Sequence, residues 1–178
     1  MIKSIFFEYD LSVFLNADYD AHHGSCISYQ KVEQKDIHGT AGGFPKSYHE
    51  DNTRIQQLWW ESSDIDFEQI GKQLGIDVIT ISAILQPPGN VVTLHRDTFF
   101  KINNLYPDDT RKKVRANIYL EDWKPGHFIN YQDKDKNWKT STHWKAGEGF
   151  IWDSEHLHLS ANAGLHSKYT LQVSGFLV

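Results

Sequence analysis

The second half of the chain is a succession of short runs that are rich in β-branched and aromatic residues. Turn sequences such as Pro87-Pro88-Gly89-Asn90 separate these runs, and no helical periodicity interrupts them. We expect strands at residues 78–86, 91–97, 114–120, 127–132, 138–144, 150–152, 157–160 and 168–177. Many short strands without helices predict a sandwich, a barrel or a jelly roll.

Two of the predicted strands carry one apolar and one polar face, because alternate residues of a strand point to opposite sides. The polar faces comprise Lys168, Thr170, Gln172 and Ser174 on one strand and Arg115, Asn117 and Tyr119 on the other. Burying so many polar groups is costly unless they are paired or bind a ligand. In a jelly roll these faces would line an internal pocket. The alternative is a one-sided sheet that turns them to solvent.

The first half of the chain combines short strand-like runs, polar loops and helical patterns. We expect one or two short strands in residues 1–15, with Ile5, Phe6, Phe7, Val13, Phe14 and Leu15 as buried candidates, and mostly loop in residues 16–50. Residues 52–60 predict a helix, since Ile55, Leu58 and Trp59 have helical spacing. A second helix should be capped by Asp64 and end at Gly75.

The whole chain is therefore expected to be one domain that is mainly β. Residues 78–178 would form a double-stranded β-helix (jelly-roll) core, and residues 1–77 would add strands, loops and helices that buttress the sheet. A length of 178 residues suits one compact domain.

Composition excludes several classes of function. The formal net charge is −5, so no basic footprint favours nucleic acid, and we expect the short run Arg111-Lys112-Lys113 to be a solvated loop. The single cysteine, Cys26, cannot form a disulfide within the chain, which favours the cytoplasm. The start of the chain is apolar for only a few residues, so we expect neither a signal peptide nor a membrane span.

The run Val91–Asp97 ends in a His-x-Asp pair. In an extended strand His95 and Asp97 would project from the same face. With a second histidine they would complete the two-histidine, one-carboxylate set that binds Fe(II). Two candidates for that histidine, His156 and His158, lie far downstream. His-x-Asp alone is a weak motif, so its context must support it.

That context resembles a known family. In order, the chain contains Pro87-Pro88-Gly89, His95-Arg96-Asp97, Arg115-Ala116-Asn117, Trp144-Lys145-Ala146-Gly147-Glu148, Asp153-Ser154 and a late histidine with a basic residue ten positions on. This ordered set, over residues 78–176, resembles the Fe(II)/2-oxoglutarate-dependent dioxygenases, and most of all their aspartyl/asparaginyl β-hydroxylase-like branch.

The resemblance implies roles for individual residues. His95, Asp97 and His158 would hold the iron, and Lys168 would bind the far carboxylate of 2-oxoglutarate. His158 is favoured over His156, because Lys168 lies ten positions after His158. Arg115 would meet the carboxylate near the iron, and Asn117, Tyr119 and Ser160 would complete the cosubstrate pocket. Arginine is commoner at the position of Lys168, so nearby hydroxyls are expected to help it.

The activity implied is hydroxylation of an amino-acid side chain in a protein or peptide, or of a small metabolite, with Fe(II), 2-oxoglutarate and O2. Residues 20–50 and 99–113 would be the loops that select the substrate. Two other readings stay open. A metal-dependent cupin enzyme that does not use 2-oxoglutarate would leave Lys168 without a role. A non-catalytic jelly-roll module would bind its ligand on Trp138, Trp144 and Trp152.

Overall fold

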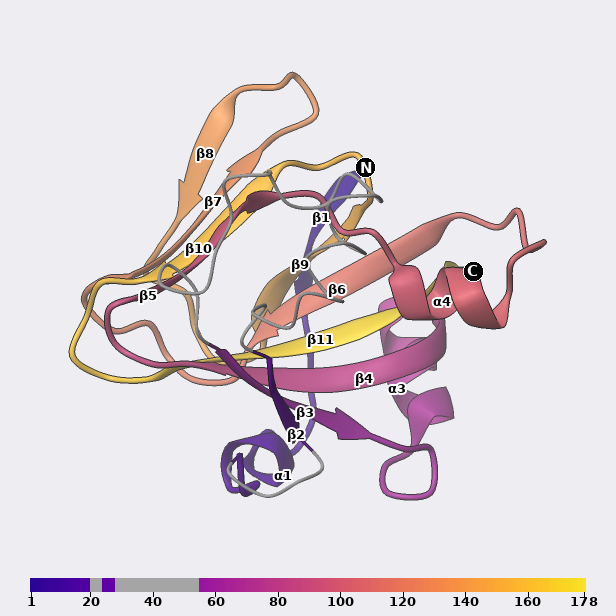
Figure 1. Ribbon diagram of the computed structural model, residues 1–178, viewed down its shortest axis with the longest axis horizontal. Coiled ribbons are helices and arrows are strands. Elements are labelled where there is room, and N and C mark those ends of the chain that lie inside the picture. Colours follow the sequence, from indigo (N-terminus) through magenta and orange to yellow (C-terminus); the bar gives the residue numbers. More distant parts are fainter. Residues whose placement is uncertain (20–23, 28–54) are drawn as a thin grey trace.

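The computed structural model describes residues 1–19, 24–27 and 55–178, with the side chains of 24–27 excepted (Figure 1). In this part of the chain the strands form two antiparallel sheets, with the orders β1-β9-β6-β11-β4-β3-β2 and β5-β10-β7-β8. The larger sheet contains β1 (Ile2–Phe6), β2 (Gly24–Ile27), β3 (Ile55–Trp60), β4 (Ile76–Gln86), β6 (Lys113–Tyr119), β9 (Glu148–Asp153) and β11 (Lys168–Leu177). The smaller sheet contains β5 (Asn90–His95), β7 (His127–Gln132), β8 (Trp138–Ser141) and β10 (His158–Asn162). The expected mainly β, jelly-roll-like fold is confirmed.

Strand β11 runs through the middle of the larger sheet, between β4 and β6. Its alternation is the one expected from the sequence. Leu171 and Val173 are fully buried in the main apolar core, whereas Thr170, Gln172 and Ser174 line a cavity on the other side of the sheet. The two faces of one strand thus separate the core from the candidate site.

The main core covers the face of the larger sheet that is turned away from the cavity. Helices α1 (Ser12–Leu15) and α3 (Phe67–Leu74) contribute to it through Phe14, Ile70 and Leu74. Asp66 caps α3 by accepting a hydrogen bond from the backbone N–H of Gln69. The helix ends at Gly75, as expected, in the left-handed conformation that glycine adopts readily. The expected cap, Asp64, lies outside the helix.

Residues 55–60 are strand β3 and not the expected helix. This strand pairs with both β2 and β4, and it buries Ile55, Gln57 and Leu58. Because both of its faces contact other parts of the protein, its apolar residues do not alternate, and their spacing resembles that of a helix. Pairing in the sheet overrides this local pattern. Residues 52–54 lie outside the described part.

Two shorter segments also differ from expectation. Ser12–Leu15 is one helical turn, in which Phe14 is buried but Val13 is exposed; Phe6, at the end of β1, is also exposed. The connection at residues 99–113 contains helix α4 (Phe100–Leu105), so the second half of the chain is not free of helices. No helix in the described part is long and apolar enough to span a membrane.

Candidate metal centre and active-site cavity

The cavity lies between the two sheets and has a volume of about 290 Å³. Its described lining comes from β3, β4, β6, β9 and β11 on one side, from β5, β7 and β10 on the other, and from the start of α4. The larger sheet supplies a ladder of polar side chains, because residues of the same face lie opposite one another across β4, β11 and β6. Five of the seven residues predicted on these polar faces, Thr170, Gln172, Ser174, Arg115 and Asn117, therefore line a pocket and do not face bulk solvent. Lys168 and Tyr119 are buried but are not among the lining residues.

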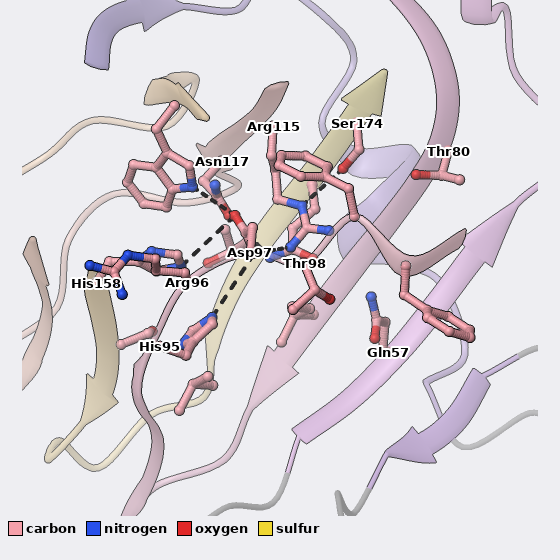
Figure 2. A pocket seen from close by; sticks show the side chains of 18 of the residues that line it. Gln57, Thr80, His95, Arg96, Asp97, Thr98, Arg115, Asn117, His158 and Ser174 are labelled. Atoms are coloured by element: carbon pink, nitrogen blue, oxygen red, sulfur yellow. Dashed lines mark hydrogen bonds and ion pairs between the residues drawn. The ribbon is translucent and has the colours of Figure 1, made fainter. Parts of the chain in front are cut away.

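Three potential metal ligands meet in this cavity. One ligand atom from each of His95, Asp97 and His158 lies within 4.8 Å of the other two. The Nε2 atoms of His95 and His158 are each 4.0 Å from an oxygen of Asp97, and the centres of the two imidazole rings are 4.2 Å apart (Figure 2). His95 and His158 lie opposite each other in the pairing of β5 with β10. Asp97 lies two residues beyond the end of β5, whereas the sequence predicted that it would be part of the strand.

Two side chains of the larger sheet hold the carboxylate of Asp97. The guanidinium of Arg115 pairs with Oδ1, and the indole N–H of Trp152 donates to Oδ2 over 2.8 Å. Burial would raise the pKa of Asp97, but Arg115 and the two imidazoles outweigh burial and lower it to about 2. The carboxylate is therefore ionised at neutral pH and fixed in orientation. This is the state in which a carboxylate binds a metal.

Both histidines are held with one nitrogen turned toward Asp97. Nδ1 of His95 lies 2.7 Å from the carbonyl oxygen of Thr93, and Nδ1 of His158 lies 3.1 Å from that of His156. A carbonyl oxygen only accepts, so Nδ1 carries the proton and the lone pair for metal binding is on Nε2. Burial lowers the pKa of both imidazoles, and the neighbouring His158 further lowers that of His95, to about 3. Two neutral imidazoles and one carboxylate fit a divalent transition metal.

His156, the other candidate, belongs to a different cluster. Its Nδ1 is 2.8 Å from Asp153, whose carboxylate also pairs with Lys112 and with the ammonium group of Met1. The structure thus brings His158, and not His156, to Asp97. It also shows that the run Arg111-Lys112-Lys113 is not simply solvated, since Arg111 pairs with Asp77 and Asp109.

Lys168 is buried behind Ser160, to which its Nζ donates over 2.5 Å. Nζ also lies 3.3 Å from the carbonyl oxygen of Phe128 and 5.7 Å from the ring centre of Trp144. No carboxylate in the described part of the chain pairs with it. Burial lowers the pKa of Lys168 to about 7. A buried ammonium without an anionic partner is costly, so this environment favours an anionic ligand.

The other predicted cosubstrate residues differ in position. Asn117 lines the cavity; its Oδ1 accepts a hydrogen bond from Gln172, while its buried Nδ2 has no partner among the described residues. Ser160 also lines the cavity. Tyr119 does not: it stacks on Trp144 with ring centres 3.8 Å apart and donates to Ser141. Tyr119 therefore supports the ring over which Lys168 lies.

The sequence did not identify one part of the cavity. Gln57 and Trp59 line it from β3, which had been expected to be a helix, and Thr80 lines it from β4. Phe99 and Lys101 line it from the start of α4, within the connection 99–113 that the sequence had indicated as a substrate-selecting loop. The alternation of β4 could have indicated Thr80, but no pattern in the sequence places β3 beside it. The predicted loop residues 20–23 and 28–50, with His22, His23, His38 and His49, lie outside the described part.

Neither a protein-family model nor a curated protein gives a significant match to the chain. Solved structures do. A prolyl-4-hydroxylase of Pseudomonas putida is similar over 99% of this chain and 91% of its own, with a TM-score of 0.57 and 19% identity. SnoK, a non-heme α-ketoglutarate-dependent carbocyclase from nogalamycin biosynthesis, is similar over 97% and 78% respectively, with a TM-score of 0.57 and 11% identity.

A third similar structure is SnoN, a non-heme α-ketoglutarate-dependent epimerase from the same biosynthesis. It covers 68% of this chain and 63% of its own, with a TM-score of 0.50 and 11% identity. The chain shares the fold of these enzymes. At such low identity the similarity establishes the fold alone, so any function depends on the residues of the cavity.

Proposed function

We propose that this protein is an Fe(II)- and 2-oxoglutarate-dependent oxygenase that hydroxylates an amino-acid side chain or a small metabolite. The observation that carries the proposal is the convergence of His95, Asp97 and His158 in one cavity beside the buried Lys168. The similarity to three enzymes whose names describe hydroxylation or α-ketoglutarate dependence supports it. The aspartyl/asparaginyl β-hydroxylase-like branch remains a prediction from the sequence.

The residues present fit the iron and its cosubstrate. His95, Asp97 and His158 would hold the metal. Ser160 is two residues after His158 on β10, so the two side chains point to the same face about 7 Å apart along the strand. Lys168 donates to Ser160, so its ammonium group lies beyond His158 along β10 and would suit the far carboxylate of a five-carbon dicarboxylate such as 2-oxoglutarate. Lys168 and Ser160 would bind that carboxylate.

Two further donors face the same space. Nδ2 of Asn117 has no partner among the described residues, and a buried donor of this kind normally has one. Arg115 uses Nε for Ser174 and Nη1 for Asp97. Its Nη2 has no hydrogen bond in the described part of the chain, so it would be available to the carboxylate nearer the metal.

When bound, the iron and 2-oxoglutarate supply the oxidative chemistry: O2, 2-oxoglutarate and a substrate C–H group yield succinate, CO2 and the hydroxylated product. The protein orients these partners and excludes water from them. Trp152 and Arg115 fix the carboxylate of Asp97, and the carbonyl groups of Thr93 and His156 fix the two imidazoles. Side chains that hold metal ligands in this way typically change metal affinity or activity about 10–100-fold when removed.

The test is an anaerobic titration of the metal-free protein with Fe(II) and then 2-oxoglutarate. We expect a visible metal-to-ligand charge-transfer band that requires both additions and is lost in His95→Ala. Succinate should then form on admission of O2. Metal binding without the band would contradict the proposal and favour a different metal-dependent jelly-roll enzyme. Failure to bind any divalent metal would indicate a binding module.

A further inference from the structure

The cavity extends past the metal-ligand group, on the side opposite Lys168. In the register of β11 with β4, Lys168 lies opposite Gln86 and Ser174 lies opposite Thr80. These two pairs are six residues apart along β11, about 20 Å. If 2-oxoglutarate occupies the end near Lys168, the end near Thr80 is left for the substrate. Figure 2 shows Gln57 and Thr80 on the far side of Asp97 from His158.

We call this second part the outer chamber, lined by Gln57, Trp59, Thr80, Phe99, Lys101 and Ile102. Half of its lining residues are apolar: Trp59 and Phe99 face the space, and Ile102 is buried at its edge. It also contains a hydrogen-bond acceptor. The side-chain nitrogen of Gln57, a largely buried residue, donates to Ser82 over 2.8 Å, so its oxygen is left without a partner among the described residues.

The charge of the cavity lining is unbalanced. The described lining includes one carboxylate, Asp97, and three permanent cations, Arg96, Lys101 and Arg115. Arg115 already neutralises Asp97. Arg96 lies on the imidazole side and donates to the carbonyl oxygen of Glu155. Fe(II), Asp97, Lys168, Arg115 and a doubly charged cosubstrate would together still leave a positive charge.

Lys101 is the cation of the outer chamber. Its Nζ lies 4.9 Å from the ring centre of Trp59, so a cation–π contact links α4 to β3 at the mouth of the cavity. It forms no ion pair with any described carboxylate. A cation over an aromatic wall, in a chamber that also contains an amide oxygen without a partner among the described residues, matches a ligand with one anionic group, one hydrogen-bond donor and an apolar body.

We propose that the substrate is a small free amino acid or hydroxy acid whose carboxylate is bound by Lys101. Its ammonium or hydroxyl group donates to Oε1 of Gln57, and its aliphatic part lies between Trp59, Phe99 and Ile102. This inference rests on the proposed oxygenase function, because it assumes that 2-oxoglutarate occupies the other end. A cavity of about 290 Å³, at the lower limit of the roughly 300–1,000 Å³ of small-molecule sites, must hold both molecules.

The inference is tested by calorimetric binding to the anaerobic protein loaded with Fe(II) and 2-oxoglutarate, after the charge-transfer band has formed. The probes are L-valine, L-leucine, 2-hydroxyisovalerate, the amides of these acids, and an acetylated valine tripeptide amide. We expect at least one free acid to bind while its amide does not. Lys101→Met should weaken that binding about 10–100-fold, as expected for loss of a charge-assisted hydrogen bond, and Lys101→Arg should retain most of it.

Lys134→Met is the matched control, since Lys134 is an exposed lysine in the turn between β7 and β8 and lies outside the cavity. The inference is overturned if no free acid binds, if amides or the capped peptide bind equally well, or if Lys101→Met binds like the wild type. The charge-transfer band distinguishes failure of the substrate proposal from failure of the oxygenase proposal. A band with no binding of free acids refutes the substrate class, whereas absence of the band refutes the oxygenase proposal.

Discussion

At the scale of single residues, the candidate metal centre depends on protonation states that burial sets for the two histidines and that neighbouring charges, above all Arg115, set for Asp97. The pKa of His95 is lowered to about 3 and that of Asp97 to about 2, so all three ligand residues are in their metal-binding forms at neutral pH. No proton must leave a ligand before the metal enters. This arrangement predicts a metal affinity that changes little between pH 6 and pH 8.

His95→Ala should remove one ligand and leave the fold intact, because His95 is at the end of β5 and its side chain is partly accessible from the cavity. We expect the affinity for Fe(II) to fall by at least about 100-fold, with a change of about 1 kcal/mol or less in the free energy of unfolding of the metal-free protein. Equilibrium dialysis and urea denaturation measure the two quantities. Wild-type metal affinity in this variant would remove the proposed site.

If Lys168 binds 2-oxoglutarate as proposed, this binding should depend on pH. Its pKa is lowered by burial to about 7, so the free protein loses this charge as the pH rises through 7, while a bound carboxylate would favour the charged form. We expect uptake of up to one proton on binding at pH 8, and an affinity that falls by about tenfold per pH unit above 7. Below pH 6 both effects should vanish.

Calorimetry in two buffers with different heats of ionisation measures the proton uptake. Lys168→Arg is the matched variant, because arginine stays charged throughout this range. Its affinity for 2-oxoglutarate should be level from pH 6 to pH 9. A wild-type affinity that is equally level would show that Lys168 does not meet the anion.

At the scale of elements, the contact between α3 and β4 places the strand that lines the cavity. A Cβ atom at Gly71 would lie 2.4 Å from the carbonyl oxygen of Ile76, so the helix approaches the strand as closely as glycine allows. Gly71→Ala should therefore destabilise the protein, by about 1–3 kcal/mol, in spite of the higher helix propensity of alanine. Urea denaturation measures this. Gln69→Ala, on the exposed side of α3, should be neutral or slightly stabilising.

The sequence predicted best the strands whose residues alternate regularly between polar and apolar. Strand β11 alternates cleanly, and it was predicted over its full length. The hairpin of β7 and β8 was also predicted, although β8 ends at Ser141 and not at Trp144. Strand β3 was not, because it packs on both sides, and with it the sequence missed Gln57 and Trp59. The metal ligands could be found because the resemblance supplied an order of motifs, whereas the outer chamber has no motif.

At the scale of the whole molecule, the candidate site lies where the two sheets meet. His95 and His158 come from the smaller sheet, while Arg115 and Trp152, which hold Asp97, come from the larger one. A bound metal should therefore stabilise the entire fold. With metal at 100 times its dissociation constant, we expect a gain of about 2.7 kcal/mol in the free energy of unfolding. Thermal denaturation with and without Mn(II) tests this, and His95→Ala should abolish the gain.

Unlike the two histidines, Asp97 should stabilise the fold even when no metal is bound. Removing it leaves the guanidinium of Arg115 and the indole N–H of Trp152 without their acceptor in the described structure. We expect Asp97→Ala to cost on the order of 3 kcal/mol even in the absence of metal, as is usual when one member of a buried ion pair is lost. Urea denaturation of the metal-free variant, beside His95→Ala, measures the difference. Equal stability of the two variants would contradict this account.

The position of Asp97 has a consequence for how such a protein can change over time. Its carboxylate joins the two halves of the sandwich as well as facing the metal, so selection for folding alone would keep it. The two histidines have no comparable role in joining the sheets. In a lineage that lost catalysis but kept the fold, we expect His95 and His158 to be substituted and Asp97, Arg115 and Trp152 to be retained.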